Sequence, residues 1–192
     1  MSKYLKVMFD NKGVNFEYKI NEVNIADTWN PQASDPKDFG GFNFSTEDKI
    51  LRWLVRGDTI YDVEIPDDAE IIDCPSESAP HGVFRSNKIL LTNPRPMTDE
   101  LAMNFYLKSD LPEKSYYKSL AGVAIRGYRN TSLKIIEDKV NKDNIDLVLS
   151  EINDFVTPYQ SSGTAENGIE VYNEVMQRLN DIKNSWLRGV LW

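Results

Sequence analysis

The spacing of the apolar residues changes near residue 97, and this change constrains the fold more than any other feature of the chain. Before it, short runs of β-branched and aromatic residues alternate with polar residues, as in half-buried strands. After it, apolar residues recur at intervals of three and four, as in amphipathic helices. The sequence therefore predicts an α+β protein: an antiparallel β-rich half followed by a C-terminal bundle of about five helices.

We expect two domains from this division. Residues 1–95 are predicted to form a β-rich domain with one short helix, and residues 96–192 a helical domain packed on it. Within the first, residues 4–9 and 14–20 are expected to pair as a hairpin, because Asp10-Asn11-Lys12-Gly13 suits a tight turn. Residues 24–39 lack periodicity and predict a surface loop.

A short strand is predicted over residues 41–44. The Ser-x-x-Asp spacing of Ser45 and Asp48 is a variant of the capping box, so Ser45 is expected to cap a helix that ends at Gly57. Residues 59–65 alternate cleanly and predict a half-buried strand.

Helix start and stop signals organise the second half. They predict helices over residues 98–108, 112–128, 130–136 and 143–156. A last helix is expected to dock through one apolar stripe, which comprises Ile169, Tyr172, Val175, Met176, Leu179, Ile182 and Trp186.

Several kinds of chemistry are disfavoured by composition and motif. One cysteine and one histidine do not supply a Cys/His zinc site or an internal disulfide, and Cys74 is interpreted as a small buried hydrophobe. Phosphate-binding glycine loops and the Gly-x-Ser-x-Gly nucleophile motif are absent. We therefore predict no metal site and no cofactor, and a protein that is more plausibly a binder than an enzyme.

Charge is distributed unevenly along the chain, whose net charge is −8. Residues 58–77 hold eight acids and no lysine or arginine, and these acids are Asp58, Asp62, Glu64, Asp67, Asp68, Glu70, Asp73 and Glu77. Residues 108–142 hold eight basic residues and four acids. The sequence thus predicts an acidic surface that steers partners and makes direct nucleic-acid binding unfavourable.

Two resemblances bear on function. The segment Gly40-Gly41-Phe42-Asn43-Phe44-Ser45-Thr46, followed by the Val-x-Ile-Pro-x-x-Ala pattern of residues 63–69, resembles a block in uncharacterised proteins of phages, prophages and giant viruses. The phrase from His81 to Ile89 also resembles phage-borne members. A more distant likeness is to the ADP-ribosyltransferase core, but the His-Gly or Arg-Gly and the late Glu-x-Glu of that family are missing here.

The first resemblance implies a viral origin. With the acidic stretch, it leads to the expectation of a non-enzymatic, anti-CRISPR-like inhibitor of host antiviral defence. Its predicted partner is a host defence or nucleic-acid-handling protein, and its contact residues are those of the acidic stretch, because clustered carboxylates imitate phosphates. The alternative is a nucleotide-handling enzyme with a pocket formed by Gly41, Phe44, Ser45 and His81.

A third possibility is an RNA-binding module. Its cations would be Lys114, Lys118, Arg126 and Arg129, and its stacking rings Tyr116, Tyr117 and Tyr128. Aromatic residues at helical spacing are more often core, so this possibility ranks last.

The two ends of the chain carry the remaining expectations. The opening residues turn acidic too early for a signal peptide, so a location in the host-cell cytoplasm without a membrane span is predicted. At the other end, Trp186 and Leu187 are expected to dock within the chain, and Val190, Leu191 and Trp192 to be available to a second copy or partner.

Overall fold

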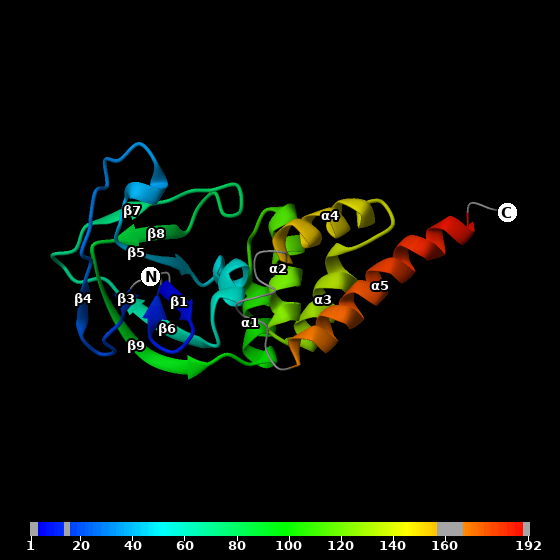
Figure 1. Ribbon diagram of the computed structural model, residues 1–192, viewed down its shortest axis with the longest axis horizontal. Coiled ribbons are helices and arrows are strands. Elements are labelled where there is room, and N and C mark those ends of the chain that lie inside the picture. The colour runs from blue at the N-terminus through cyan, green and yellow to red at the C-terminus, as the bar shows by residue number, and fades with distance from the viewer. Residues whose placement is uncertain (1–3, 14–15, 157–166, 190–192) are drawn as a thin grey trace. The chain divides into compact units, whose positions relative to one another are not determined.

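The computed structural model describes residues 4–13, 16–156 and 167–189 (Figure 1). The chain is α+β and divides into two units. The sheet unit contains the described parts of residues 1–50, 56–97 and 108–111, and the helical unit contains residues 51–55, 98–107 and those from 112 onward.

The sheet unit is built around a seven-stranded antiparallel sheet with the order β4-β9-β6-β1-β5-β8-β7. Its strands are β1 (Tyr4–Met8), β4 (Val23–Ile25), β5 (Phe42–Thr46), β6 (Thr59–Glu64), β7 (Ile71–Asp73), β8 (Val83–Ser86) and β9 (Lys88–Pro96). A separate pair is formed by β2 (Lys12–Gly13) and β3 (Phe16–Glu17), and a short 3-10 helix, η1, spans Pro36–Asp38.

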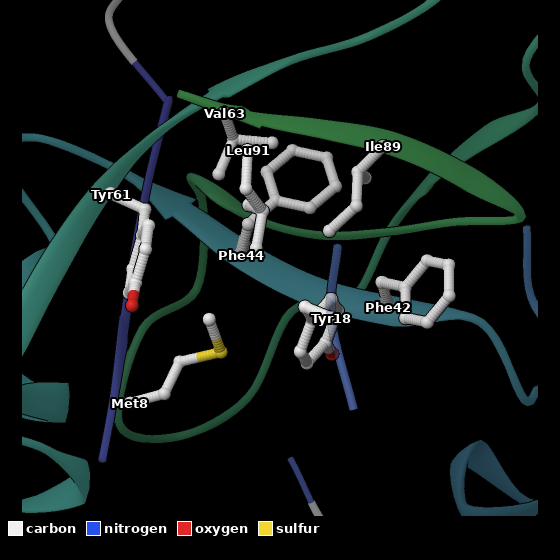
Figure 2. Packing of buried hydrophobic residues seen from close by; sticks show 8 residues of the cluster. All are labelled: Met8, Tyr18, Phe42, Phe44, Tyr61, Val63, Ile89 and Leu91. Carbon is white, nitrogen blue, oxygen red and sulfur yellow. The ribbon is translucent and has the colours of Figure 1, made fainter. Parts of the chain in front are cut away.

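The sheet curls strongly, as its connectivity requires. Asn87 alone separates β8 from β9, yet β6, β1 and β5 lie between these two strands in the sheet order. The chain step across Asn87 therefore brings distant parts of the sheet together. The inner side holds an apolar core made of Met8, Tyr18, Phe42, Phe44, Tyr61, Val63, Ile89 and Leu91. Figure 2 shows these side chains converging from several strands.

Alternation along each strand explains this core. In β5, Phe42 and Phe44 are buried while Asn43 between them is exposed, because successive side chains point to opposite faces. The rings of Phe16 and Phe42 meet edge to face with centroids 4.8 Å apart, a favoured aromatic geometry.

The predicted hairpin between residues 4–9 and 14–20 is wrong. β1 pairs with β5 and β6, so that Leu5 lies opposite both Ser45 and Asp62, while β2 pairs with β3. The predicted loop over residues 24–39 is also partly wrong, because β4 pairs with β9 at its start. These pairings join segments far apart in the sequence, which local turn signals do not register.

The predicted helix cap at Ser45 is wrong as well. β5 extends through Thr46, whose N–H donates to the Gly82 carbonyl at 2.9 Å, and Ser45 is paired opposite Val83. The 3-10 helix η2 begins later and spans Ile50–Arg56, and its N-cap, Lys49, makes no side-chain capping bond. The stop at Gly57 is confirmed, since Gly57 is the C-cap of η2.

The helical unit follows the predicted start signals closely. Its helices are α1 (Asp99–Lys108), α2 (Glu113–Ile125), α3 (Arg129–Lys139), α4 (Ile145–Val156) and α5 (Gly168–Gly189). Thr98 caps α1 by accepting a hydrogen bond from the Leu101 N–H at 3.2 Å. Most of the side chains of α2 are buried, and α2 contacts α3, α4 and α5.

Polar contacts tie these helices together. The Asp99 carboxylate accepts hydrogen bonds from the N–H groups of Asn130 and Thr131 at 2.7 and 2.9 Å, which stabilises the start of α3. Glu151 of α4 lies 3.6 and 3.3 Å from the ammonium groups of Lys114 and Lys118. The unit is therefore held by capping and ion pairs in addition to apolar packing.

Candidate functional site

The acidic stretch of residues 58–77 lies in the sheet unit. It comprises β6, the turn after it, β7 and the loop beyond β7. Asp62 is half-buried, and the exposed carboxylates are Asp58, Glu64, Asp67, Asp68, Glu70, Asp73 and Glu77. Seven of the eight acids of the stretch are therefore exposed.

Two of these carboxylates form ion pairs within the chain. The register of β6 and β9 shifts between Ile60 and Asp62, so that Arg95 reaches Asp62, with Nη2 and Oδ1 2.6 Å apart. Lys88 Nζ lies 2.5 Å from Asp68 Oδ2, and this hydrogen bond lowers the pKa of Asp68 below its usual value. Asp62 and Asp68 are thus already engaged, which reduces what they offer a partner.

Three further carboxylates accept hydrogen bonds from neutral donors. Asp58 accepts from the Thr59 hydroxyl, Glu64 from the Thr92 hydroxyl, and Glu70 from the Trp29 indole. Within the described part of the chain, Asp67, Asp73 and Glu77 have neither a side-chain hydrogen bond nor an ion pair. These last three, which we name the edge carboxylates, are the most available negative charges of the stretch.

The edge carboxylates precede, end and follow β7 along the chain, and β7 is the last strand at one side of the sheet. Asp67 lies in the turn before β7, Asp73 ends the strand, and Glu77 lies in the loop after it. Ile71 within β7 is 41% exposed. This side of the sheet therefore combines an exposed apolar side chain with uncompensated negative charge.

The residues of the alternative pocket do not share one face. Phe44 lies in the apolar core, and its ring stacks on Phe84 with centroids 5.8 Å apart. Ser45 is the next residue of the same strand, so its side chain points to the opposite face, where it is 1% exposed. His81 is exposed, and Gly41 packs close to the Trp29 ring.

Lys6 is a buried lysine, and its burial was not predicted from the sequence. Its side chain is 7% exposed, and its Nζ donates to the backbone oxygen and to Oδ1 of Asn43, each at 2.7 Å. The ammonium also lies 5.1 Å from the centre of the Tyr18 ring. No carboxylate of the described chain pairs with it.

The position of Lys6 explains both its burial and its titration. Along β1 it shares a face with Tyr4 and Met8, which pack on or in the core. Burial, and after it the positive charges of Arg56 and Arg85, lower the pKa of the Lys6 amine from 10.5 to about 7. The signal in the sequence is the alternation itself, because a lysine stands at a core position of an apolar strand.

The aromatic residues proposed for RNA stacking are not available. Tyr116, Tyr117 and Tyr128 are all buried. Among the matching cations, Lys114 and Lys118 pair with Glu151, and Arg129 pairs with Glu174. The described helices therefore do not present the predicted stacking surface.

Other chemical possibilities find little support in the described residues. No group of three or more histidine, cysteine or acidic side chains is placed to hold a metal ion there. Cys74 is half-buried, and burial raises the pKa of its thiol. No helix among those described has the length and apolar character to cross a bilayer.

The predicted C-terminal contacts lie outside what the structure describes. Residues 190–192, which include Val190, Leu191 and Trp192, are not among the described residues, and the side chains of Trp186 and Leu187 are not described either. The self-association surface predicted there stays a prediction.

Comparisons with known proteins return no relative of this chain. No family model, no curated protein and no solved structure matches it.

Proposed function

We propose that this protein is a viral, non-enzymatic binding protein that inhibits a host antiviral defence system, in the manner of an anti-CRISPR protein. Its acidic surface would bind a cationic face of a defence or nucleic-acid-handling protein, in the place that nucleic-acid phosphates otherwise occupy. The viral origin rests on the resemblance of residues 40–46 and 63–69 to phage and giant-virus proteins.

One observation carries the proposal of a binding surface. The edge carboxylates Asp67, Asp73 and Glu77 are exposed, and no described side chain neutralises them. Exposed carboxylates without counter-charges give this part of the surface a negative potential that attracts a cationic partner. Such a surface also accelerates encounter with an arginine-rich or lysine-rich partner.

Charge selects the class of partner. A net charge of −8 and an acidic edge oppose direct contact with phosphates, so the partner is a protein rather than a nucleic acid. The edge carboxylates contribute more to partner binding than Asp62 and Asp68 do, because Asp62 already pairs with Arg95 and Asp68 with Lys88.

The test is an interference assay in bacterial cells that carry an active CRISPR system. Expression of the protein should increase recovery of transformants that carry a targeted plasmid. The triple variant Asp67→Asn, Asp73→Asn, Glu77→Gln should lose this effect, because it removes the free charges and leaves the internal ion pairs intact.

A matched control makes the same change of charge in the helical unit. Glu100→Gln, Glu170→Gln, Asp181→Asn also replaces three exposed acids and should retain the effect. Inhibition that is absent from the native protein, or equal in the two triple variants, would refute the proposed function.

A further inference from the structure

The backbone of β7 offers hydrogen-bonding groups on its outer side. β7 pairs with β8 in antiparallel register, with Ile72 opposite Arg85. The Cys74 N–H donates to the Val83 carbonyl at 2.8 Å, and the Asn87 N–H donates to the Glu70 carbonyl at 3.2 Å. In an antiparallel ladder, hydrogen-bonded positions alternate along the strand.

This alternation decides which groups are open. Residues 70, 72 and 74 direct their backbone groups toward β8, so Ile71 and Asp73 direct theirs away from it. Because β7 is the last strand of the sheet, no other strand among the described residues takes up the N–H and C=O groups of Ile71 and Asp73. An unpaired edge of this kind is a template for an added strand.

The surroundings of β7 restrict what is added there. Ile71 is 41% exposed and gives the edge an apolar contact. Asp67, Asp73 and Glu77 give it one sign of charge, with Glu70 also exposed at the start of the strand. A second copy of this chain would place acids against acids, which is unfavourable, whereas a basic strand would face complementary charge.

The opposite edge of the sheet makes a useful contrast. Val23 and Ile25 of β4 are 48% and 62% exposed, so this edge is more apolar than β7. The charges near it have both signs, since Lys19 and Glu22 pair with each other at 3.9 Å. Charge therefore selects a partner at β7 and not at β4.

We propose that β7 receives an extended, lysine-rich or arginine-rich segment of a partner protein, which adds to the sheet as an eighth strand next to the seven observed. Backbone hydrogen bonds to Ile71 and Asp73 would supply affinity, and the edge carboxylates would select basic side chains at alternate positions of the segment. This inference rests on the proposed function and specifies how the partner is held.

The test uses a capped peptide of alternating lysine and valine, acetyl-Lys-Val-Lys-Val-Lys-Val-Lys-amide, and calorimetry at low salt. Ile71→Pro removes the outward N–H while leaving the bonds to β8 intact, and proline is tolerated at strand edges. Ile71→Ala is its control, because it removes the same side chain and keeps the N–H. We expect the peptide to bind Ile71→Pro about tenfold more weakly than Ile71→Ala.

Two further measurements control for misfolding of the proline variant and for effects of charge alone. A lysine-valine peptide with N-methyl groups at alternate residues should bind the native protein about tenfold more weakly than the unmodified peptide, since one edge of the methylated peptide has no backbone N–H donors. Ile25→Pro, which removes an outward N–H from the β4 edge, should leave binding unchanged.

The outcomes separate the inference from the proposed function. Loss of peptide binding in the triple variant of the edge carboxylates, with equal binding to Ile71→Pro and Ile71→Ala, would overturn strand addition and keep the acidic surface. Binding that survives the triple variant would argue against the proposed function itself. Absence of binding to the native protein at about millimolar peptide would overturn the inference, since a site of this kind should be detectable there.

Discussion

Replacing Lys6 by methionine should make the sheet unit more stable at neutral pH. The buried amine has its pKa lowered from 10.5 to about 7, so the folded state disfavours the charged form. One pKa unit corresponds to about 1.4 kcal/mol, so the charge costs the folded state up to about 5 kcal/mol at pH 7 and below. Methionine has a similar length and no charge to desolvate.

The sign of the pH dependence follows from proton binding. Between pH 7 and 10.5 the unfolded chain holds a proton on Lys6 that the folded chain has released, so stability rises with pH by about 1.4 kcal/mol per pH unit. Below pH 7 both states are protonated and this contribution is constant. Lys6→Met should remove the slope between pH 7 and 10.5.

The lost hydrogen bonds offset part of the gain. Lys6 donates twice to Asn43, and removing these bonds costs about 1–3 kcal/mol, an amount that water reduces because Asn43 is exposed. The net expectation at pH 7 is a stabilisation of about 2–4 kcal/mol. Near pH 10 the order should reverse, because little of the charge penalty remains there and the hydrogen bonds are still made.

Guanidinium titrations at pH 6, 7, 8 and 9, followed by tryptophan fluorescence, measure this difference. Lys12→Met is the matched control, since Lys12 is exposed in the same unit and its replacement should leave the slope unchanged. Equal pH slopes for the native protein and Lys6→Met would refute the assignment of Lys6 as a buried amine with a lowered pKa.

Three further predictions concern other contacts. Gly57→Ala should destabilise the sheet unit by about 1–3 kcal/mol in denaturant titrations, because its Cβ would lie 2.1 Å from the Met8 carbonyl carbon; unchanged stability would show that the backbone moves freely there. Asp99→Ala should lower the stability of the helical unit by about 0.5–2 kcal/mol, and Asp99→Asn should lower it by less, because the amide oxygen still caps α3. Thermal unfolding measures this difference. An Asp99→Ala variant that is at least as stable as Asp99→Asn would show that the cap is unimportant. Binding of the lysine-valine peptide should weaken steadily as sodium chloride is raised, and calorimetry that shows no salt dependence would exclude the edge carboxylates as its site.

The helices could be predicted because their signals are local. Thr98 caps α1 from within the same segment, and Pro112 directly precedes α2. Strand β6 could also be predicted, since the alternation of residues 59–65 can be recognised without knowing which strand pairs with it.

The strand partners could not be predicted because pairing is not local. The turn-like Asp10-Asn11-Lys12-Gly13 favours a hairpin, yet Leu5 pairs opposite Ser45 and Asp62. The capping signal at Ser45 also does not lead to a helix cap. The Thr46 N–H donates to the carbonyl of Gly82, which is distant in the sequence, and this hydrogen bond keeps Thr46 in β5. Tertiary pairing overrode the local preference in both places.

The candidate site shows the same division. Exposure of the acids follows from their type and could be predicted. Their neutralisation could not, because Arg95 and Lys88 lie 33 and 20 residues from the acids that they pair with. Lys6 was overlooked because its burial depends on which face of β1 the curled sheet encloses.

Amide hydrogen exchange of β7, followed by NMR, tests most directly whether this edge is the binding surface. In the free protein, the Ile72 amide should exchange slowly because it is paired with β8, and the Ile71 and Asp73 amides should exchange quickly. Addition of the lysine-valine peptide should slow exchange at Ile71 and Asp73. Unchanged exchange at both amides in the bound state would contradict the account.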